Sequence, residues 1–165
     1  MVLDLLRRPG TRVLTLAGPG GVGKTTLAHA VERSIAPDMP NGGLFVSLAG
    51  ISSPDDVPVA LTAAASIYVG QRSPAEAIDA WLDGKSLLLV LDNLEHVLGA
   101  RTFIEALIQN HPNVIVLATS RERLGLSDES LFQVDPLRVE PAGTPVNDLR
   151  TASPAVRLFV QRVRD

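Results

Sequence analysis

Two short, continuous apolar segments limit most strongly what this chain can fold into. Residues 87–91 read Leu-Leu-Leu-Val-Leu, residues 114–118 read Val-Ile-Val-Leu-Ala, and neither contains a polar side chain. A strand without a polar face has to be buried on both sides, which is typical of a parallel sheet covered by helices on each face. Both segments are far shorter than the ~20 apolar residues that span a bilayer, so no membrane partner is expected.

Strand-like and helix-like segments alternate along the 165 residues. Further strands are expected at residues 13–17, 43–48 and 131–134. Helices are expected from Lys24 to about Ile35, from Ser53-Pro54 onward, from Ser73-Pro74 to about Trp81, from about Glu95 to Gln109, and after Ser153-Pro154, following a loop at 136–153. Ser-Pro with an acid two or three residues after the Ser is typical of a helix N-terminus. The alternation predicts an α/β fold with a parallel sheet.

Composition and charge exclude several classes of protein. Hydrophobic residues make up 45% and charged residues 20%, which excludes a disordered tail. The net charge of −3 predicts no direct nucleic-acid contact, and Arg7, Arg8 and Arg12 are expected on solvated helix faces. The chain has no cysteine and its histidines are scattered, so neither a disulfide nor a zinc site is expected. No secretion signal is visible, which favours the cytoplasm.

A glycine-rich segment lies between the first expected strand and helix. Residues 18–25 read Gly-Pro-Gly-Gly-Val-Gly-Lys-Thr and fit the pattern G-x-x-x-x-G-K-[ST]. In such a loop, backbone N–H groups and a helix N-terminus surround a di- or triphosphate. Lys24 would contact the β- and γ-phosphates, and the Thr25 hydroxyl would bind Mg²⁺. The candidate nucleotide-binding residues are Gly18, Pro19, Gly20, Gly21, Val22, Gly23, Lys24, Thr25 and Thr26. A glycine-rich hairpin is the alternative, but it does not account for Lys-Thr leading into a helix.

An acidic residue ends the apolar segment 87–91. We expect Asp92 to bind Mg²⁺ opposite Thr25, although an ordinary helix-capping role is the alternative. Many ATPases that have such a glycine-rich loop carry a second acid directly after this Asp, where it acts as general base. Here the neighbour is Asn93, whose amide cannot accept a proton. Glu95 is the nearest carboxylate. It could act as the base, or it could be an acidic residue in the first turn of a helix, where its charge interacts favourably with the helix dipole. The sequence therefore predicts slow hydrolysis, or none.

An arginine follows the apolar segment 114–118. In open α/β sheets, ligands bind at the carboxyl ends of the strands, so Arg121 is a candidate for contacting a γ-phosphate. A surface salt bridge is the alternative for Arg121, and Arg123 is a weaker candidate for the same contact.

These features occur in a fixed order at residues 15–28, 88–97, 116–124, 134–137 and 153–162. Together they resemble the nucleotide-binding core of the STAND class, the signal-transduction ATPases with numerous domains. The closest likeness is to the NB-ARC-like ATPase segment of large bacterial transcriptional regulators. The resemblance implies a P-loop NTPase three-layer sandwich with a five-stranded parallel sheet of order 5-1-4-3-2, spanning residues 13–165 after an N-terminal flank at 1–12.

The resemblance also implies a function. Members bind ATP or ADP with Mg²⁺ and use nucleotide exchange to change from a closed form to an open form that assembles with partners. The expected partners are the nucleotide, other domains of a parent protein and further copies of the chain on activation. The helical lid and winged-helix domains of the family are not evident in the sequence. Two alternatives remain: a non-hydrolysing interaction module, and a small P-loop kinase, for which Arg138 and Arg150 are too few and too spread to make a convincing lid.

Overall fold

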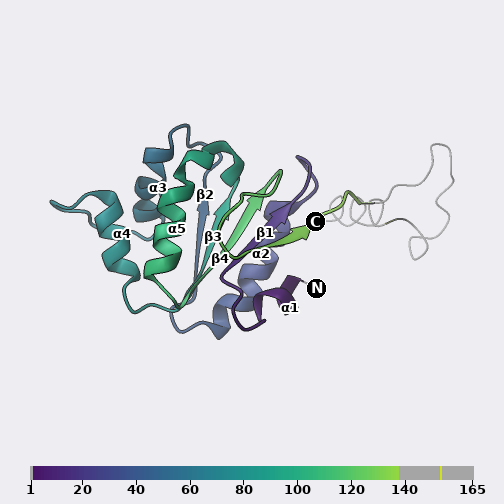
Figure 1. The fold of residues 1–165 in the computed structure, drawn as a ribbon, viewed down its shortest axis with the longest axis horizontal. Helices are drawn as coiled ribbons and strands as arrows, with labels where there is room; N and C mark the ends of the chain where they lie inside the picture. The colour runs from purple at the N-terminus through teal and green to yellow at the C-terminus, as the bar shows by residue number, and fades with distance from the viewer. Residues whose placement is uncertain (1, 138–152, 154–165) are drawn as a thin grey trace, which may run out of the picture. The chain divides into compact units, whose positions relative to one another are not determined.

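The computed structural model describes residues 2–137 and 153, and its central feature is a five-stranded sheet. The strands are β1 (Val13–Ala17), β2 (Gly43–Ser47), β3 (Leu87–Asp92), β4 (Val114–Ser120) and β5 (Glu129–Gln133). Every strand pairing is parallel. The order β2-β3-β4-β1-β5 confirms the predicted order 5-1-4-3-2, read from the opposite edge (Figure 1).

Helices cover both faces of this sheet. They are α1 (Val2–Leu6), α2 (Lys24–Ile35), α3 (Val57–Ala64), α4 (Pro74–Leu82) and α5 (Arg101–Asn110), with 3-10 segments at Ala36–Asp38, Pro54–Asp56 and Leu94–Ala100. One hydrophobic cluster joins α1 and α2 to the sheet, and another joins α3, α4 and α5 to the opposite face (Figure 1). The predicted three-layer α/β fold is therefore confirmed.

The side chains of β3 show why its sequence is apolar throughout. Leu87, Leu89 and Leu91 belong to the cluster formed with α3, α4 and α5, whereas Leu88 and Val90 belong to the cluster formed with α1 and α2. Successive side chains of a strand point to opposite faces, so a central strand between two helical layers needs apolar residues at every position.

Two predicted helices differ from the structure at their starts. The helix expected from Glu95 is a 3-10 segment up to Ala100, and it leaves helical geometry at Val97 (φ −133°, ψ 42°) before α5 begins. This segment packs tightly, because a Cβ on Gly99 would lie 2.6 Å from a side-chain carbon of Pro54. Such a tertiary contact can override local helix propensity. The helix expected after Ser53 likewise opens with a 3-10 turn before α3.

The start of α4 matches the prediction. Ser73 Oγ accepts a hydrogen bond from the backbone N–H of Glu76, and the Glu76 carboxylate accepts one from the backbone N–H of Ser73. This reciprocal arrangement satisfies two backbone donors of the first turn.

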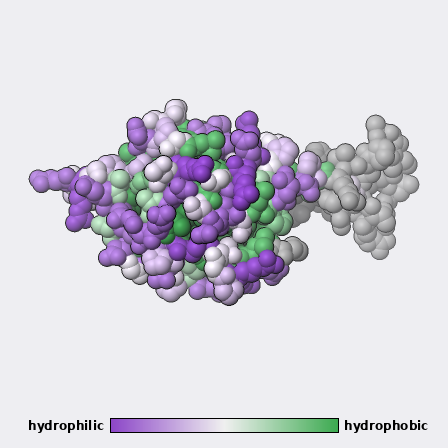
Figure 2. Space-filling model, in the orientation of Figure 1, coloured by the Kyte–Doolittle hydropathy of each residue, from purple (hydrophilic) through white to green (hydrophobic). Residues whose placement is uncertain are grey.

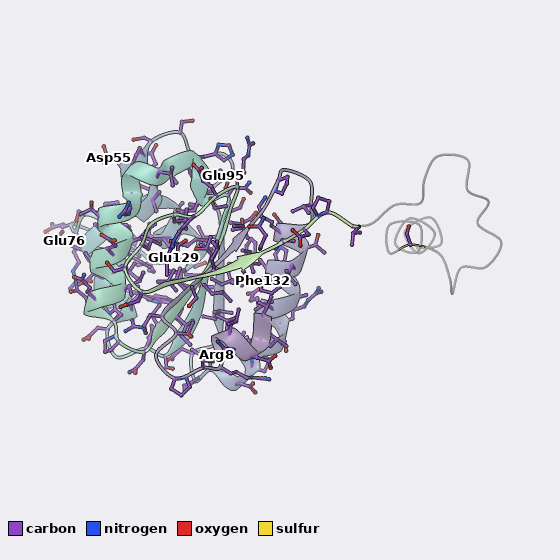
Figure 3. All side chains as sticks on the ribbon, turned by 45° about the vertical axis from the view of Figure 1, so that its right-hand side comes forward. Arg8, Asp55, Glu76, Glu95, Glu129 and Phe132 are labelled. Carbon is purple, nitrogen blue, oxygen red and sulfur yellow. The ribbon has the colours of Figure 1, made fainter. Side chains whose placement is uncertain are left out.

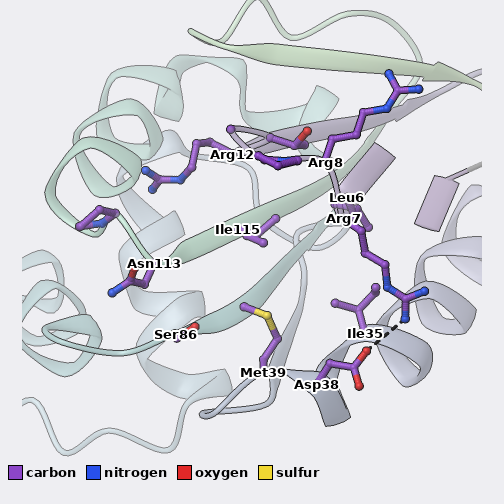
Figure 4. Close-up of a pocket in the computed structure, with 14 residues that line it drawn as sticks. Leu6, Arg7, Arg8, Arg12, Ile35, Asp38, Met39, Ser86, Asn113 and Ile115 are labelled. Atoms are coloured by element: carbon purple, nitrogen blue, oxygen red, sulfur yellow. Dashed lines mark hydrogen bonds and ion pairs between the residues drawn. The ribbon is translucent and has the colours of Figure 1, made fainter. Parts of the chain in front are cut away.

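The N-terminal flank contains the helix α1, whose bounds the sequence did not predict. Val2 and Leu6 of α1 are buried against the cluster around α2. A pocket of about 430 Å³ adjoins α1, and the arginines that line it point apart (Figure 4). Arg7 pairs with Asp38 at 3.1 Å, and the Arg12 guanidinium donates to backbone carbonyl oxygens at the end of α5. The expectation of a helix face is wrong for all three arginines, because α1 ends at Leu6. Arg7 and Arg8 are exposed as expected, whereas Arg12 is half-buried and anchors the end of α5.

The face of the molecule shown in Figure 2 is mostly polar. In Figure 2, hydrophilic residues cover most of the face shown, and hydrophobic residues appear as small separate areas. Among residues 2–137 and 153, no helix has the length and apolar character needed to cross a membrane. The loop expected at 136–153 lies almost entirely outside the described residues, and so does the helix expected after Ser153.

Candidate functional site

The glycine-rich loop joins the end of β1 to the start of α2. Gly21 and Gly23 have φ angles of 75° and 96°, in the left-handed region that favours glycine. Gly23 is also the N-cap of α2, whose first turn contains no acidic residue. Pro19, Gly20 and Thr26 are exposed, and Val22 is half-buried. The loop therefore presents backbone and a helix N-terminus at one end of the sheet, an arrangement suited to an anion.

Gly18 fits against the end of β5. A Cβ at this position would lie only 2.4 Å from the backbone oxygen of Val134, so no larger residue fits without movement of the backbone. The N–H of Val134 donates to the Ala17 oxygen at 2.7 Å, and the N–H of Gly18 donates to the Ser120 oxygen at 3.2 Å. The first residue of the loop is thus fixed between the ends of β4 and β5.

Lys24 is buried at the base of the loop with 8% of its surface exposed. Its ammonium donates to the carbonyl oxygens of Gly18 at 2.8 Å and Pro19 at 2.9 Å. Within the described ranges 2–137 and 153, it forms no ion pair with a carboxylate. The loop therefore encloses a positive charge that carbonyl oxygens contact and that no acid of the described residues pairs with.

Thr25 and Asp92 lie beside each other, as the sequence predicts for two metal-binding groups. The Thr25 hydroxyl donates to the Asp92 carboxylate oxygens at 2.9 and 3.1 Å. Asp92 is buried and also accepts a hydrogen bond from Thr119 Oγ1 at 2.6 Å. Two hydroxyl donors thus orient a carboxylate next to the first turn of α2.

Asn93 occupies a left-handed backbone conformation, with φ 65° and ψ 41°. Asn is enriched in this region, where most other side chains are strained. Its backbone N–H donates to Thr119 Oγ1 at 2.9 Å. The local geometry therefore suits a short polar side chain such as Asn or Asp at this position, and here it is the amide, which cannot act as a base.

The structure pairs two predicted site residues with each other. Arg121 Nε lies 3.4 Å from Glu95 Oε1, and Glu95 is the more buried partner, with 10% of its side chain exposed against 65% for Arg121. The second Glu95 oxygen is buried without a hydrogen-bond partner in the described part of the chain. Glu95 lies at the end of the sheet opposite Arg8 (Figure 3). Arg123, the weaker candidate, instead pairs with Glu129 at 3.3 Å.

Sequence reasoning missed two residues that shape this region. Thr119 connects Asp92 to the backbone of Asn93, and its only sequence signal is a hydroxyl directly after a buried strand. Glu129 accepts hydrogen bonds from the backbone N–H groups of Leu124 and Gly125 at 2.9 and 2.8 Å. Burial alone would raise the pKa of the Glu129 carboxyl, but these N–H groups and Arg123 lower it overall. No sequence signal identified Glu129, because its partners are set by the turn that follows β4.

Magnesium is compatible with the residues present. The described residues contain no group of three or more His, Cys, Asp or Glu side chains that could hold a metal by themselves. Mg²⁺ usually keeps several waters and binds through one or two protein groups together with substrate phosphates. The oriented Asp92 carboxylate and the Thr25 hydroxyl fit that requirement.

Sequence comparison relates the chain to bacterial regulatory proteins, although no protein-family model matches it. It is 32% identical over 155 residues to an uncharacterized protein of Mycobacterium tuberculosis, covering 93% of this chain and 36% of that protein. It is 30% identical over 162 residues to the regulatory protein AfsR of Streptomyces griseus, covering 92% and 15%. It is 35% identical over 132 residues to a Mycobacterium tuberculosis protein named as an HTH-type transcriptional regulator, covering 78% and 14%. The chain thus spans about a third or less of the length of these relatives.

Structural comparison agrees on the fold. Cdc6p from Pyrobaculum aerophilum superposes with a TM-score of 0.62 at 14% identity, over 81% of this chain and 42% of that one. The ORC2 protein of Aeropyrum pernix, solved as ADPNP-ADP complexes, gives a TM-score of 0.51 at 15% identity, over 68% and 35%. At such identities the likeness concerns the fold alone. The chain therefore has the fold of these proteins and is similar in sequence to bacterial regulatory proteins, in agreement with the resemblance drawn from its motifs.

Proposed function

We propose that this chain binds ATP or ADP together with Mg²⁺ and acts as the nucleotide-dependent switch domain of a larger transcriptional regulator. The observation that carries the proposal is the buried ammonium of Lys24, which only loop carbonyl oxygens contact among the described side chains and backbone groups. A buried charge without a counter-charge is costly, so this arrangement favours an anionic ligand beside it.

The surroundings of Lys24 favour a polyphosphate over a single small anion. The loop at residues 18–23 offers backbone N–H groups over several residues, and α2 directs its N-terminus toward the same place. Asp92 and Thr25 would hold Mg²⁺, which would supply positive charge to the phosphates. In this arrangement Lys24 and the loop bind the phosphates, and Thr119 keeps the Asp92 carboxylate oriented.

Hydrolysis by this site should be slow. Asn93 cannot accept a proton from an attacking water, and one oxygen of Glu95 is already paired with Arg121. Slow turnover suits a domain that holds its nucleotide for a long time. The same observation supports the second candidate, an interaction module that binds nucleotide without hydrolysing it. Most of the segment on which the kinase alternative depends lies outside the described residues.

The regulatory part of the proposal comes from the relatives. Their names describe regulatory proteins, and the chain matches only 14–15% of the length of two of them. We therefore propose that the partners of this domain are other domains of a parent regulator, and further copies of the chain once nucleotide is exchanged. DNA contact would then belong to another domain, in agreement with the net charge of −3.

Thermal unfolding with added nucleotide tests the proposal. A ligand that binds only the folded state stabilises it by about 2.7 kcal/mol at a hundredfold excess over Kd. Millimolar Mg-ADP or Mg-ATP should therefore raise the Tm of the wild-type chain by several degrees. Lys24→Ala should abolish the increase, whereas Lys85→Ala should keep it, because Lys85 lies over the Trp81 ring. An unchanged Tm of the wild-type chain with both nucleotides contradicts the proposal.

A further inference from the structure

The Glu95–Arg121 ion pair is asymmetric. Glu95 is nine-tenths buried, whereas about two-thirds of the Arg121 side chain is exposed. Among the residues that the structure describes, Arg121 contacts no other carboxylate. Glu95 Oε1 faces the guanidinium at 3.4 Å, and Glu95 Oε2 is buried without a hydrogen-bond partner in the same part of the chain. Among the described residues, Glu95 therefore depends on one solvent-exposed cation to compensate its charge.

The pair lies between two parts of the proposed nucleotide site. Arg121 directly follows Ser120, whose backbone oxygen accepts the hydrogen bond from the Gly18 N–H at the start of the loop. Glu95 lies three residues after Asp92, on the 3-10 segment that follows β3. Because β3 and β4 are paired in the sheet, both residues emerge at the same end of it.

A triphosphate would offer Arg121 a second anionic partner. Guanidinium groups bind phosphate oxygens through paired, charge-assisted hydrogen bonds. Arg121 is exposed enough to turn from Glu95 toward such a group, whereas Glu95 is held by its burial. When Arg121 turns away, the Glu95 carboxylate is left buried and unpaired, which is unfavourable. A terminal phosphate therefore has to compete with Glu95 for the same guanidinium.

We propose that Glu95 is a specificity-determining residue that acts through Arg121, and that their ion pair biases this chain toward a nucleoside diphosphate over a triphosphate. This inference rests on the proposed nucleotide binding and goes beyond it by assigning the di- versus triphosphate preference to one ion pair. A diphosphate leaves the pair intact, so its affinity does not depend on Glu95 or Arg121. Glu95 is accordingly a positioning residue, and its effect is on binding before any chemical step.

Affinities measured by calorimetry test the inference. The full chain is titrated with Mg-ADP and with the non-hydrolysable triphosphate Mg-AMP-PNP, and the readout is the ratio of the two dissociation constants. Glu95→Gln keeps the shape of the side chain and removes its charge. It should shift the ratio about two- to fivefold toward the triphosphate, the range expected from a partly exposed ion pair, and leave ADP affinity unchanged. Arg121→Ala should weaken AMP-PNP about tenfold or more and ADP little.

A double variant separates the ion pair from simple charge repulsion between Glu95 and the phosphate. If the two residues act as a pair, Glu95→Gln improves triphosphate binding only in chains that keep Arg121. An equal improvement in the Arg121→Ala chain, or no improvement in either, overturns the inference. If Arg121→Ala does not fold, as the Tm of the ligand-free chain will show, Arg121→Gln takes its place, because its amide still donates to Glu95.

A matched variant controls for the loss of any exposed arginine. Arg101 is half-exposed and lies 3.6 Å from Glu105, so Arg101→Ala removes a similar ion pair away from the loop and should leave the ratio unchanged. A change in the ratio of the two dissociation constants in this variant counts against the inference. A wild-type chain that binds neither nucleotide contradicts the proposed function itself. Normal ADP binding with the same ratio in wild type and Glu95→Gln contradicts only the role of Glu95.

Discussion

Thr25 and Asp92 are separated by 67 positions in the sequence, yet the Thr25 hydroxyl donates to the Asp92 carboxylate at 2.9 Å. Strand β3 ends at Asp92, and α2 begins one residue before Thr25. The contact therefore depends on how the sheet places the end of β3 beside the first turn of α2. It brings a hard oxygen ligand and a hydroxyl together where Mg²⁺ would bridge to phosphate.

Asp92→Asn should remove the Mg²⁺ dependence of nucleotide binding. The amide keeps the size of the side chain and can still accept from Thr25, but it lacks the negative charge that Mg²⁺ prefers. ADP affinity of the wild-type chain should fall when EDTA replaces Mg²⁺, and affinity of the variant should be low and equal under both conditions. Titration calorimetry measures this difference. Asp83→Asn, at the residue directly after the C-terminal end of α4, should behave as wild type. A variant that keeps the full Mg²⁺ response rules out Asp92 as a ligand.

Gly18→Ala should destabilise the fold. The added Cβ would lie 2.4 Å from the Val134 oxygen, a backbone atom that cannot move without disturbing the end of β5. Overpacking of this kind costs about 1–3 kcal/mol. Gly20→Ala is the matched control, because a Cβ there has no atom within 4 Å and the φ of Gly20 is not positive. Denaturant unfolding compares the two. Equal free energies of unfolding would show that the contact with Val134 is not restrictive.

Glu129→Ala should strongly destabilise the fold, although Glu129 lies next to an exposed loop. It would leave the buried N–H groups of Leu124 and Gly125 without their acceptor, at a cost of about 3 kcal/mol. Glu122→Ala, which removes an exposed carboxylate from the same loop, should change stability by less than about 0.5 kcal/mol. The free energy of unfolding in urea measures both. A small effect at Glu129 would mean that water replaces the carboxylate.

The Asp79–His111 contact should make stability depend on acid pH. The hydrogen bond from His111, 2.9 Å from Asp79, and a second from Asn110 lower the pKa of Asp79 from its ordinary value of 3.8. The folded state thus holds the Asp79 proton less tightly than the unfolded chain does. The contribution of Asp79 to the free energy of unfolding is therefore full above about pH 4 and is lost as the pH falls through the lower pKa of the folded state. Between pH 6 and pH 3, Tm should fall less steeply for Asp79→Asn than for wild type. Parallel curves would contradict the assignment.

Much of the fold could be predicted because it depends on interactions between residues close in sequence. The strand Val13–Ala17 and the helix Lys24–Ile35 were predicted at their observed bounds, since an apolar run, a glycine cluster and Pro37 mark them locally. The helix expected from Glu95 to Gln109 was only half right. Its first part is a 3-10 segment fitted against Pro54, a residue distant in the sequence.

The candidate site likewise has a part that local sequence patterns predicted and a part that they did not. The loop at 18–25 and the acid at the end of β3 follow from local patterns, and the order of the sheet followed from a resemblance to a known family. The sequence could not show that Arg121 pairs with Glu95, nor that Glu129 holds the turn after β4.

The sequence alone thus determined which segments become strands and helices and which loop is rich in backbone donors, because the spacing of apolar and glycine residues controls local conformation. Tertiary structure decided which charges meet. The pairing of Glu95 with Arg121 depends on how the ends of β3 and β4 lie beside each other, and such contacts between distant segments leave no periodic trace in the chain.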